Sequence, residues 1–266
     1  MTFPFLARHG ASLAEAARTM TARGMCLAAL LTLSALQGAP AAGEASSPAP
    51  AAHKRASFGQ QQVSKEVSGL AGWIVHSADN QGMPFLIVDK VNAQVLVFET
   101  DGRLKGAASA LLGLARGDDS TPGIGERKLS TIQAHERTTP AGRFVASLDR
   151  NLHGIEVLWI DYATSLSLHR VVKGTPGEQR AQRLNSATSA DNRISFGCIN
   201  VPVSFFDRMV SPVFTGTNGI VYILPESRTA REVFGSYDVD EAAQALAPAT
   251  HTPTPAAASR IQHAVQ

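Results

Sequence analysis

Four short apolar runs, rich in β-branched and aromatic residues, constrain the fold of this chain more than any other feature. Each run is four or five residues long, a length typical of a β-strand and too short for a core helix. Thr100-Asp101-Gly102 supplies a turn after the second run, and residues 66–77 are weakly helical. The pattern therefore predicts a mainly β fold, in one compact β-rich domain over residues 66–228. The runs are Phe85–Val88, Gln94–Phe98, Glu156–Ile160 and Ile220–Leu224.

The two ends of the chain differ in composition from its middle. Arginines precede an apolar run over residues 25–36, and the small residues Ala39-Pro40-Ala41 follow it, as in a secretory signal peptide. We therefore expect residues 1–41 to be a signal peptide and the mature chain to be exported to the periplasm or cell envelope; an uncleaved membrane anchor is the alternative. Residues 42–65 are expected to be a flexible linker and residues 229–266 a largely disordered C-terminal tail, because both contain few groups that can pack.

Removal of the signal peptide would take Cys26 with it and leave Cys198 as the one cysteine of the mature chain. A lone thiol in an exported protein is either an inert buried side chain or a reactive group. Gly197 allows a sharp turn just before it, and a short helix is expected after Pro202. Thiolates are stabilised near helix N-termini. These neighbours favour a reactive Cys198.

A candidate general base lies at the end of a strand expected over residues 164–169. Side chains alternate along a strand, so His169 belongs to a polar face opposite an apolar one. An imidazole there can take a proton from a cysteine and later return it to a leaving amine. A solvated or hydrogen-bonded structural histidine is the alternative interpretation. The polar face is Ser165, Ser167 and His169, and the apolar face is Leu166 and Leu168.

Three motifs in order complete the pattern: Thr139-Pro140-Ala141-Gly142-Arg143-Phe144, then His169, then Ser195-Phe196-Gly197-Cys198-Ile199-Asn200. Over residues 83–225 the chain resembles the L,D-transpeptidase catalytic domain, whose cysteine enzymes cross-link bacterial peptidoglycan. The resemblance implies a β-sandwich-like, β-rich domain with a short helix after the cysteine. The cysteine signature is the specific part of the resemblance, since a threonine-proline-glycine segment alone is an ordinary turn.

The resemblance implies a role for each residue of the motif. Cys198 would be the nucleophile and His169 the general base and acid, with its other ring nitrogen held by a backbone carbonyl near Arg170. Ser195 would shape the loop, and the backbone N–H groups around Phe196, Gly197 and Cys198 would form the oxyanion site.

The chain also departs from the family pattern. Phe196 and Arg170 stand where many members have histidine and glycine, and 29 positions separate His169 from Cys198, more than is usual. The inserted residues 170–193 carry a net charge of +3. We expect this segment to bind substrate carboxylates through arginine; a solvated surface loop is the alternative. The expected substrate-binding residues are Arg170, Arg193 and Asn200, and a helix cap is the alternative role for Asn200.

The function implied is an exported cysteine acyltransferase acting on peptidoglycan stem peptides. It would release D-alanine, hold the acyl group on Cys198 and pass it to an amine; carbapenems would inhibit it covalently. An L,D-carboxypeptidase that uses water, and a catalytically silent peptidoglycan-binding homologue, are the alternatives. No nucleic-acid partner is expected, because the formal net charge is only +2 without a basic block. No metal or cofactor is expected, since His76, His135 and His153 lack the spacing of a ligand set.

Overall fold

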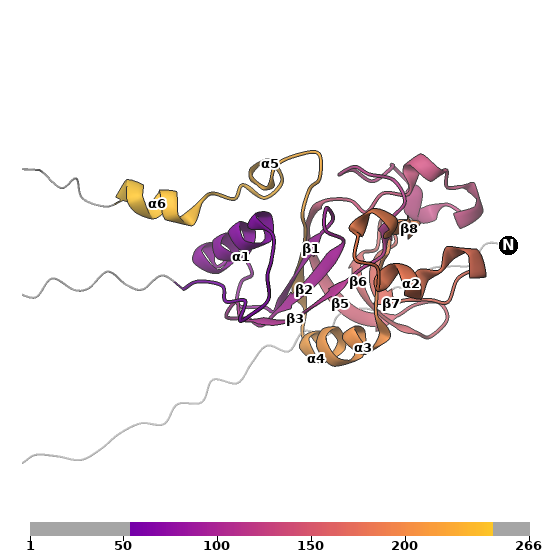
Figure 1. The fold of residues 1–266 in the computed structure, drawn as a ribbon, viewed down its shortest axis with the longest axis horizontal. Helices are drawn as coiled ribbons and strands as arrows, with labels where there is room; N and C mark the ends of the chain where they lie inside the picture. The colour runs from indigo at the N-terminus through magenta and orange to yellow at the C-terminus, as the bar shows by residue number, and fades with distance from the viewer. Residues whose placement is uncertain (1–53, 247–266) are drawn as a thin grey trace, which may run out of the picture. The chain divides into compact units, whose positions relative to one another are not determined.

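The structure is a computed structural model that describes residues 54–246, and within that range the fold is mainly β (Figure 1). The mainly β prediction is therefore confirmed. The predicted signal peptide, residues 42–53 of the predicted linker and residues 247–266 lie outside the described residues. Within residues 54–246 no helix is both long and apolar enough to cross a membrane.

One sheet of eight strands forms the body of the domain, in the order β3-β2-β1-β10-β5-β6-β7-β9. Its neighbours are antiparallel except for the parallel pairs β1/β10 and β7/β9, and a separate parallel pair joins β4 to β8. The strands are β1 Phe85–Asp89, β2 Gln94–Phe98, β3 Leu104–Ser109, β4 Leu112–Gly113, β5 Gly142–Arg150, β6 Glu156–Asp161, β7 Leu166–Arg170, β8 Arg193–Ser195, β9 Ile199–Val201 and β10 Gly219–Ile223.

The two outer strands of this sheet meet, which gives the sheet a barrel-like form. Leu111, which follows β3, exchanges two backbone hydrogen bonds with Asn200 of β9, at 2.8 and 2.9 Å. Alternate side chains of the strands point inward and form a closed apolar core. Helical residues after β9, namely α3 Val203–Phe205, η6 Phe206–Val210 and α4 Ser211–Phe214, add aromatic side chains to the same core. The short helix predicted after the cysteine is confirmed.

A second apolar layer covers the outer face of β1, β2 and β10. These strands are buried on both faces, which is why their sequences are continuous apolar runs instead of alternating ones. The covering helix is α1 Lys65–Ser77, which begins where the Ser64 side chain accepts a hydrogen bond from the N–H of Val67. Its buried residues recur at helical spacing, so one face of the helix packs on the sheet. The predicted helix over residues 66–77 is confirmed.

Both predicted flanks contain ordered backbone within the described range. Ser57, in the predicted linker, makes backbone hydrogen bonds of 3.0 and 2.8 Å with Gly102 and Leu104. Beyond residue 228 the chain forms α5 Ala230–Phe234 and α6 Val239–Leu246, where the sequence suggested a disordered tail. Phe234 and Val239 pack on the outer apolar layer beside α1 (Figure 1). A few apolar side chains on a polar background are enough to dock these short helices.

Two long excursions from the sheet flank its β7/β9 edge. The first, between β4 and β5, contains η1 Ile124–Glu126, η2 Leu129–Thr131 and η3 Ala134–Glu136. The second, between β7 and β8, contains η4 Pro176–Glu178, α2 Arg180–Leu184 and η5 Ser189–Asp191. The loop that carries Cys198 lies between β8 and β9, so both excursions border it.

Candidate active site

Cys198 immediately precedes β9, and the parallel pairing of β9 with β7 sets its neighbours. Leu168 is paired with Ile199 and His169 with Asn200. Ile199 points into the barrel core, so strand alternation turns Cys198 to the outer face. Ser167 and His169 of β7 occupy the same outer face, as the sequence predicted. The strand itself begins at Leu166 instead of Thr164.

The imidazole of His169 and the thiol of Cys198 line the same cavity, and each influences the pKa of the other. The Nδ1 atom of His169 lies 2.8 Å from the backbone oxygen of Arg170, which confirms the predicted carbonyl contact. A carbonyl oxygen only accepts hydrogen bonds, so Nδ1 carries the proton in the neutral ring. The other nitrogen, Nε2, is then free to accept a proton from the thiol.

Each member of this pair favours the charged form of the other. Burial by itself would lower the pKa of His169, but the hydrogen bond and charge of Cys198, with the Arg170 carbonyl, raise it above its usual value. Burial would likewise raise the pKa of the Cys198 thiol, but His169 and then Ser167 outweigh it and lower that pKa. Opposite charges at close range produce shifts in these directions. The shifts therefore move Cys198 toward the thiolate form and His169 toward the imidazolium form.

Two serines complete the surroundings of the sulfur. The Ser167 hydroxyl donates to Sγ of Cys198 at 3.6 Å, and Sγ lies 3.4 Å from the backbone oxygen of Ser165. Ser165 has a φ of 55°, in the left-handed region that non-glycine residues seldom adopt. This conformation belongs to the turn over residues 162–165 and explains why the strand starts at Leu166, two residues later than predicted.

The loop before Cys198 is held by its own side chains. The Ser195 hydroxyl donates to the Cys198 carbonyl oxygen at 2.6 Å and accepts from the Gly197 N–H at 3.1 Å. Ser195 therefore shapes the loop as predicted. The expected oxyanion role of the Gly197 N–H is wrong in this arrangement, because that N–H already has Ser195 as its partner. Among the described residues, the backbone N–H groups of Phe196 and Cys198 make no hydrogen bond, so both remain available as donors in this loop.

Cys198 lies where two cavities approach each other. One, of about 150 Å³, is formed by the β4–β5 excursion with Thr138, Pro140 and Phe196. The other, of about 480 Å³, is lined by His169, by the aromatic ring of Trp159 and by aliphatic side chains that include Ile155, Val172 and Val203. A group bound in either cavity would reach the same sulfur atom.

The expected substrate-binding arginines are occupied by the protein. Arg170 donates to Asp207 at 2.7 Å and to the carbonyl of Glu156 at 3.0 Å, and its guanidinium stacks on Phe206. Arg193 donates to both carboxylate oxygens of Glu226, at 3.2 and 2.6 Å, and to the carbonyl of Lys90 at 2.9 Å. Its side chain is only 8% exposed. Both guanidinium groups therefore already have partners within the protein, and substrate binding by Arg170 and Arg193 stays a prediction.

The side chain of Asn200 is also hydrogen-bonded within the protein and does not lie at an open surface. It is 1% exposed in β9, and its Nδ2 donates to the Cys198 carbonyl at 3.2 Å while its Oδ1 accepts from Arg180 at 3.0 Å. The alternative helix-cap role is wrong, because the following helix is capped at Pro202; the substrate-binding role stays a prediction. The Cys198 carbonyl is thus held from two sides.

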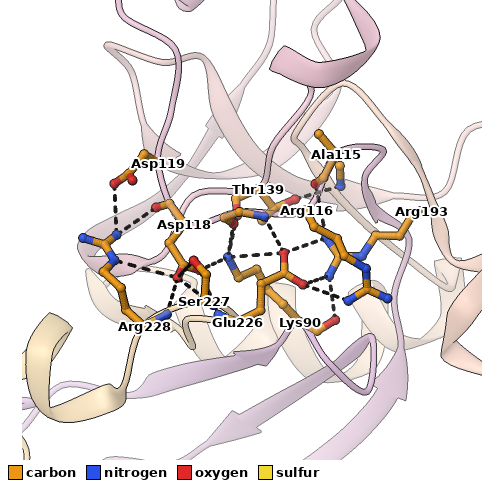
Figure 2. Close-up of polar contacts among 12 residues, drawn as sticks. Lys90, Ala115, Arg116, Asp118, Asp119, Thr139, Arg193, Glu226, Ser227 and Arg228 are labelled. Atoms are coloured by element: carbon orange, nitrogen blue, oxygen red, sulfur yellow. Dashed lines mark hydrogen bonds and ion pairs between the residues drawn. The ribbon is translucent and has the colours of Figure 1, made fainter.

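A buried polar cluster that the sequence did not predict lies behind the loop that carries Cys198. Figure 2 shows its polar contacts. Lys90 and Asp118 have fully buried side chains and pair at 2.7 Å, and Lys90 also donates to the carbonyl oxygens of Gly117 and Thr139 at 2.6 and 3.1 Å. Burial lowers the pKa of Lys90 despite Asp118. Burial would raise the pKa of Asp118, but Lys90, Ser227 and backbone N–H groups hold it well below its usual value. No local pattern marks these residues, which lie far apart along the chain.

Comparison with known proteins gives only distant similarity. No protein-family model matches the chain, and no curated protein matches it significantly. Among solved structures it is similar to the L,D-transpeptidase of Xylanimonas cellulosilytica (13% identity, TM-score 0.34, covering 53% of this chain and 60% of that chain). It is also similar to the Ldtfm–avibactam carbamoyl enzyme (19%, 0.32, 54% and 49%) and to the catalytic domain of the E. faecium L,D-transpeptidase (18%, 0.32, 53% and 95%). The chain spans less than two thirds of the first two structures, so activity has to be argued from the site itself.

Proposed function

We propose that this chain is a cysteine acyltransferase of the L,D-transpeptidase type that acts on peptidoglycan stem peptides. The observation that carries the proposal is the Cys198–His169 pair. A thiol of lowered pKa contacts an imidazole of fixed tautomer, at the junction of two cavities. This combination is what nucleophilic catalysis by cysteine requires. The motif resemblance around Cys198 supplies the substrate class.

The first half-reaction follows from these contacts. Nε2 of His169 takes the thiol proton, and Sγ of Cys198 bonds to the carbonyl carbon that precedes the terminal D-alanine of a tetrapeptide stem. Negative charge on the carbonyl oxygen would be stabilised by the N–H of Cys198. The carbon–nitrogen bond then breaks, and the imidazolium returns its proton to the leaving amine. Free D-alanine departs, and the acyl group remains on Cys198 as a thioester.

The second half-reaction transfers the acyl group. An acceptor amine attacks the thioester carbonyl, His169 takes the proton from that amine, and the thiol is re-formed with the same proton. The two cavities support transfer to an amine, because an acyl donor in one cavity leaves the other open to an acceptor. Such a reaction requires access to peptidoglycan. The function therefore agrees with the export that the N-terminal sequence predicts.

The test is intact-protein mass spectrometry after mixing the purified full-length chain with a carbapenem. We expect a stoichiometric adduct on Cys198 by peptide mapping. Incubation with disaccharide-tetrapeptide should then give free D-alanine and a cross-linked product. A tripeptide without cross-links would instead identify the carboxypeptidase, and an alkylatable thiol that forms neither adduct nor product would identify a silent peptidoglycan-binding protein.

A further inference from the structure

The hydroxyl group of Thr139 connects two loops behind the candidate nucleophile. Thr139 is fully buried. Its Oγ1 accepts a hydrogen bond from the N–H of Gly113 at 2.8 Å and donates one to the carbonyl oxygen of Gly197 at 2.7 Å. A hydroxyl group has one proton. Since the Gly113 N–H can only donate, that proton points to Gly197.

The Gly197 carbonyl belongs to the same peptide group as the N–H of Cys198. A trans peptide is planar, with its C=O and N–H pointing in opposite directions. Holding the oxygen toward Thr139 therefore turns the Cys198 N–H away from Thr139. We propose that Thr139 is a positioning residue that orients the Cys198 N–H as the oxyanion donor of the site. This inference rests on the proposed acyl-transfer function. It gives the oxyanion role to the Cys198 N–H because the Gly197 N–H is bonded to Ser195.

The backbone around Thr139 is packed too closely for this peptide group to rotate freely. A Cβ atom at Gly113 would lie 2.3 Å from the backbone oxygen of Arg137 and 2.7 Å from the nitrogen of Thr139. A Cβ atom at Gly197 would lie 2.9 Å from the backbone oxygen of Thr138, and Gly197 has a φ of 131°. The segment at residues 137–139 thus lies tightly between Gly113 of β4 and the loop that carries Gly197, with the Thr139 hydroxyl as the hydrogen-bonding link.

The buried cluster of Figure 2 holds Thr139 from its other side. Lys90 donates to the Thr139 carbonyl at 3.1 Å and pairs with Asp118, which accepts backbone N–H groups of Glu226, Ser227 and Arg228 at 2.8 to 2.9 Å. A buried ion pair adds little net stability but becomes costly when one partner is lost. The cluster therefore fixes the position of the Thr139 backbone, from which its hydroxyl reaches Gly197.

Two reactions of the same thiol separate this role from a general structural one. Acylation by a carbapenem develops charge on a carbonyl oxygen, so it depends on the Cys198 N–H. Alkylation by iodoacetamide displaces iodide at a saturated carbon and develops no such oxyanion, so it reports only the thiolate and its access. Loss of the Thr139 hydroxyl should affect the first reaction and spare the second.

The experiment measures both rates on the full-length chain for the parent, Thr139→Val, Thr139→Ser and Thr215→Val. We expect Thr139→Val to lower the carbapenem acylation rate about 10- to 100-fold, with alkylation changed less than about twofold. Thr139→Ser should restore most of the acylation rate, because serine keeps the hydroxyl. Thr215 is exposed at the C-terminal end of α4, and its hydroxyl donates to the Ser211 carbonyl at 2.7 Å. It is the matched control, and its variant should match the parent.

Parental acylation by Thr139→Val, or an equal loss of both rates, would overturn the inference while leaving the proposed function intact. A parent that is alkylated but never acylated would contradict the proposed function and this inference together. If Thr139→Val does not fold by circular dichroism, Thr139→Ala takes its place in the same comparison.

Discussion

The thiol of Cys198 and the imidazole of His169 line the same cavity, and each shifts the pKa of the other, although 29 positions separate them in the sequence. The parallel pairing of β7 with β9 brings the two residues together, and the Arg170 carbonyl fixes the ring. The intervening residues leave the sheet as a separate excursion and do not come between them. The length of this insertion therefore has no effect on the geometry of the pair.

Replacing Cys198 by alanine should abolish adduct formation while the protein remains folded. The side chain is half-buried, so we expect the free energy of unfolding to change by less than about 1.5 kcal/mol. Intact-protein mass after carbapenem treatment and thermal unfolding test the two parts. Cys198→Ser is the matched control, since it keeps a hydrogen-bonding group of similar size. An adduct on the alanine variant would refute the assignment of the nucleophile.

Replacing His169 by glutamine should lower the acylation rate by about 10²- to 10⁴-fold, the usual effect of losing a general base. Glutamine keeps a hydrogen-bonding group beside Cys198 but cannot take a proton. Stopped-flow acylation at saturating carbapenem, with circular dichroism as the folding control, measures the change. Acylation at the parental rate would show that another group serves as the base.

The pH dependence of Cys198 alkylation should report the pair directly. The thiolate is the reactive form and is populated above the thiol pKa. Because His169 lowers the pKa of Cys198, the alkylation midpoint should lie below that of an ordinary cysteine. In His169→Gln the burial of the thiol remains without its partner, so the midpoint should move to higher pH. Iodoacetamide rates across the pH range test this, and equal midpoints in both proteins would count against the pair.

Replacing Arg193 by alanine should destabilise the protein by about 3 kcal/mol, because the carboxylate of Glu226 would lose its closest partner inside the protein. Arg116→Ala is the matched control: Arg116 contacts the same carboxylate at 3.2 Å, but its side chain is 68% exposed. That change should cost less than about 1 kcal/mol. Urea unfolding compares the two variants. A fully stable Arg193→Ala with a selective loss of peptide turnover would return Arg193 to a substrate-binding role.

The sequence by itself determined the features that depend on local pattern. Short apolar runs rich in β-branched and aromatic residues marked β1, β2, β6 and β10, because a run of four or five such residues fits a strand and is too short for a core helix. The helical spacing of apolar residues marked α1, because one face of a helix recurs about every 3.6 residues. The same alternation placed Ser167 and His169 on one face, and the glycine before Cys198 marked the turn.

Only the tertiary structure decided which polar groups would find partners inside the protein. The sequence suggested that Arg193 lies in a basic loop open to substrate, but in the structure it forms an ion pair with Glu226, 33 positions away. The hydrogen bond from Thr139 to Gly197 spans 58 positions. The Gly197 N–H donates to the side chain of Ser195 and is therefore not available to a substrate. A hydrogen bond between distant residues leaves no period in the sequence. The chain pattern therefore identifies the chemical groups of the site, and the packing decides which of them remain available for a substrate.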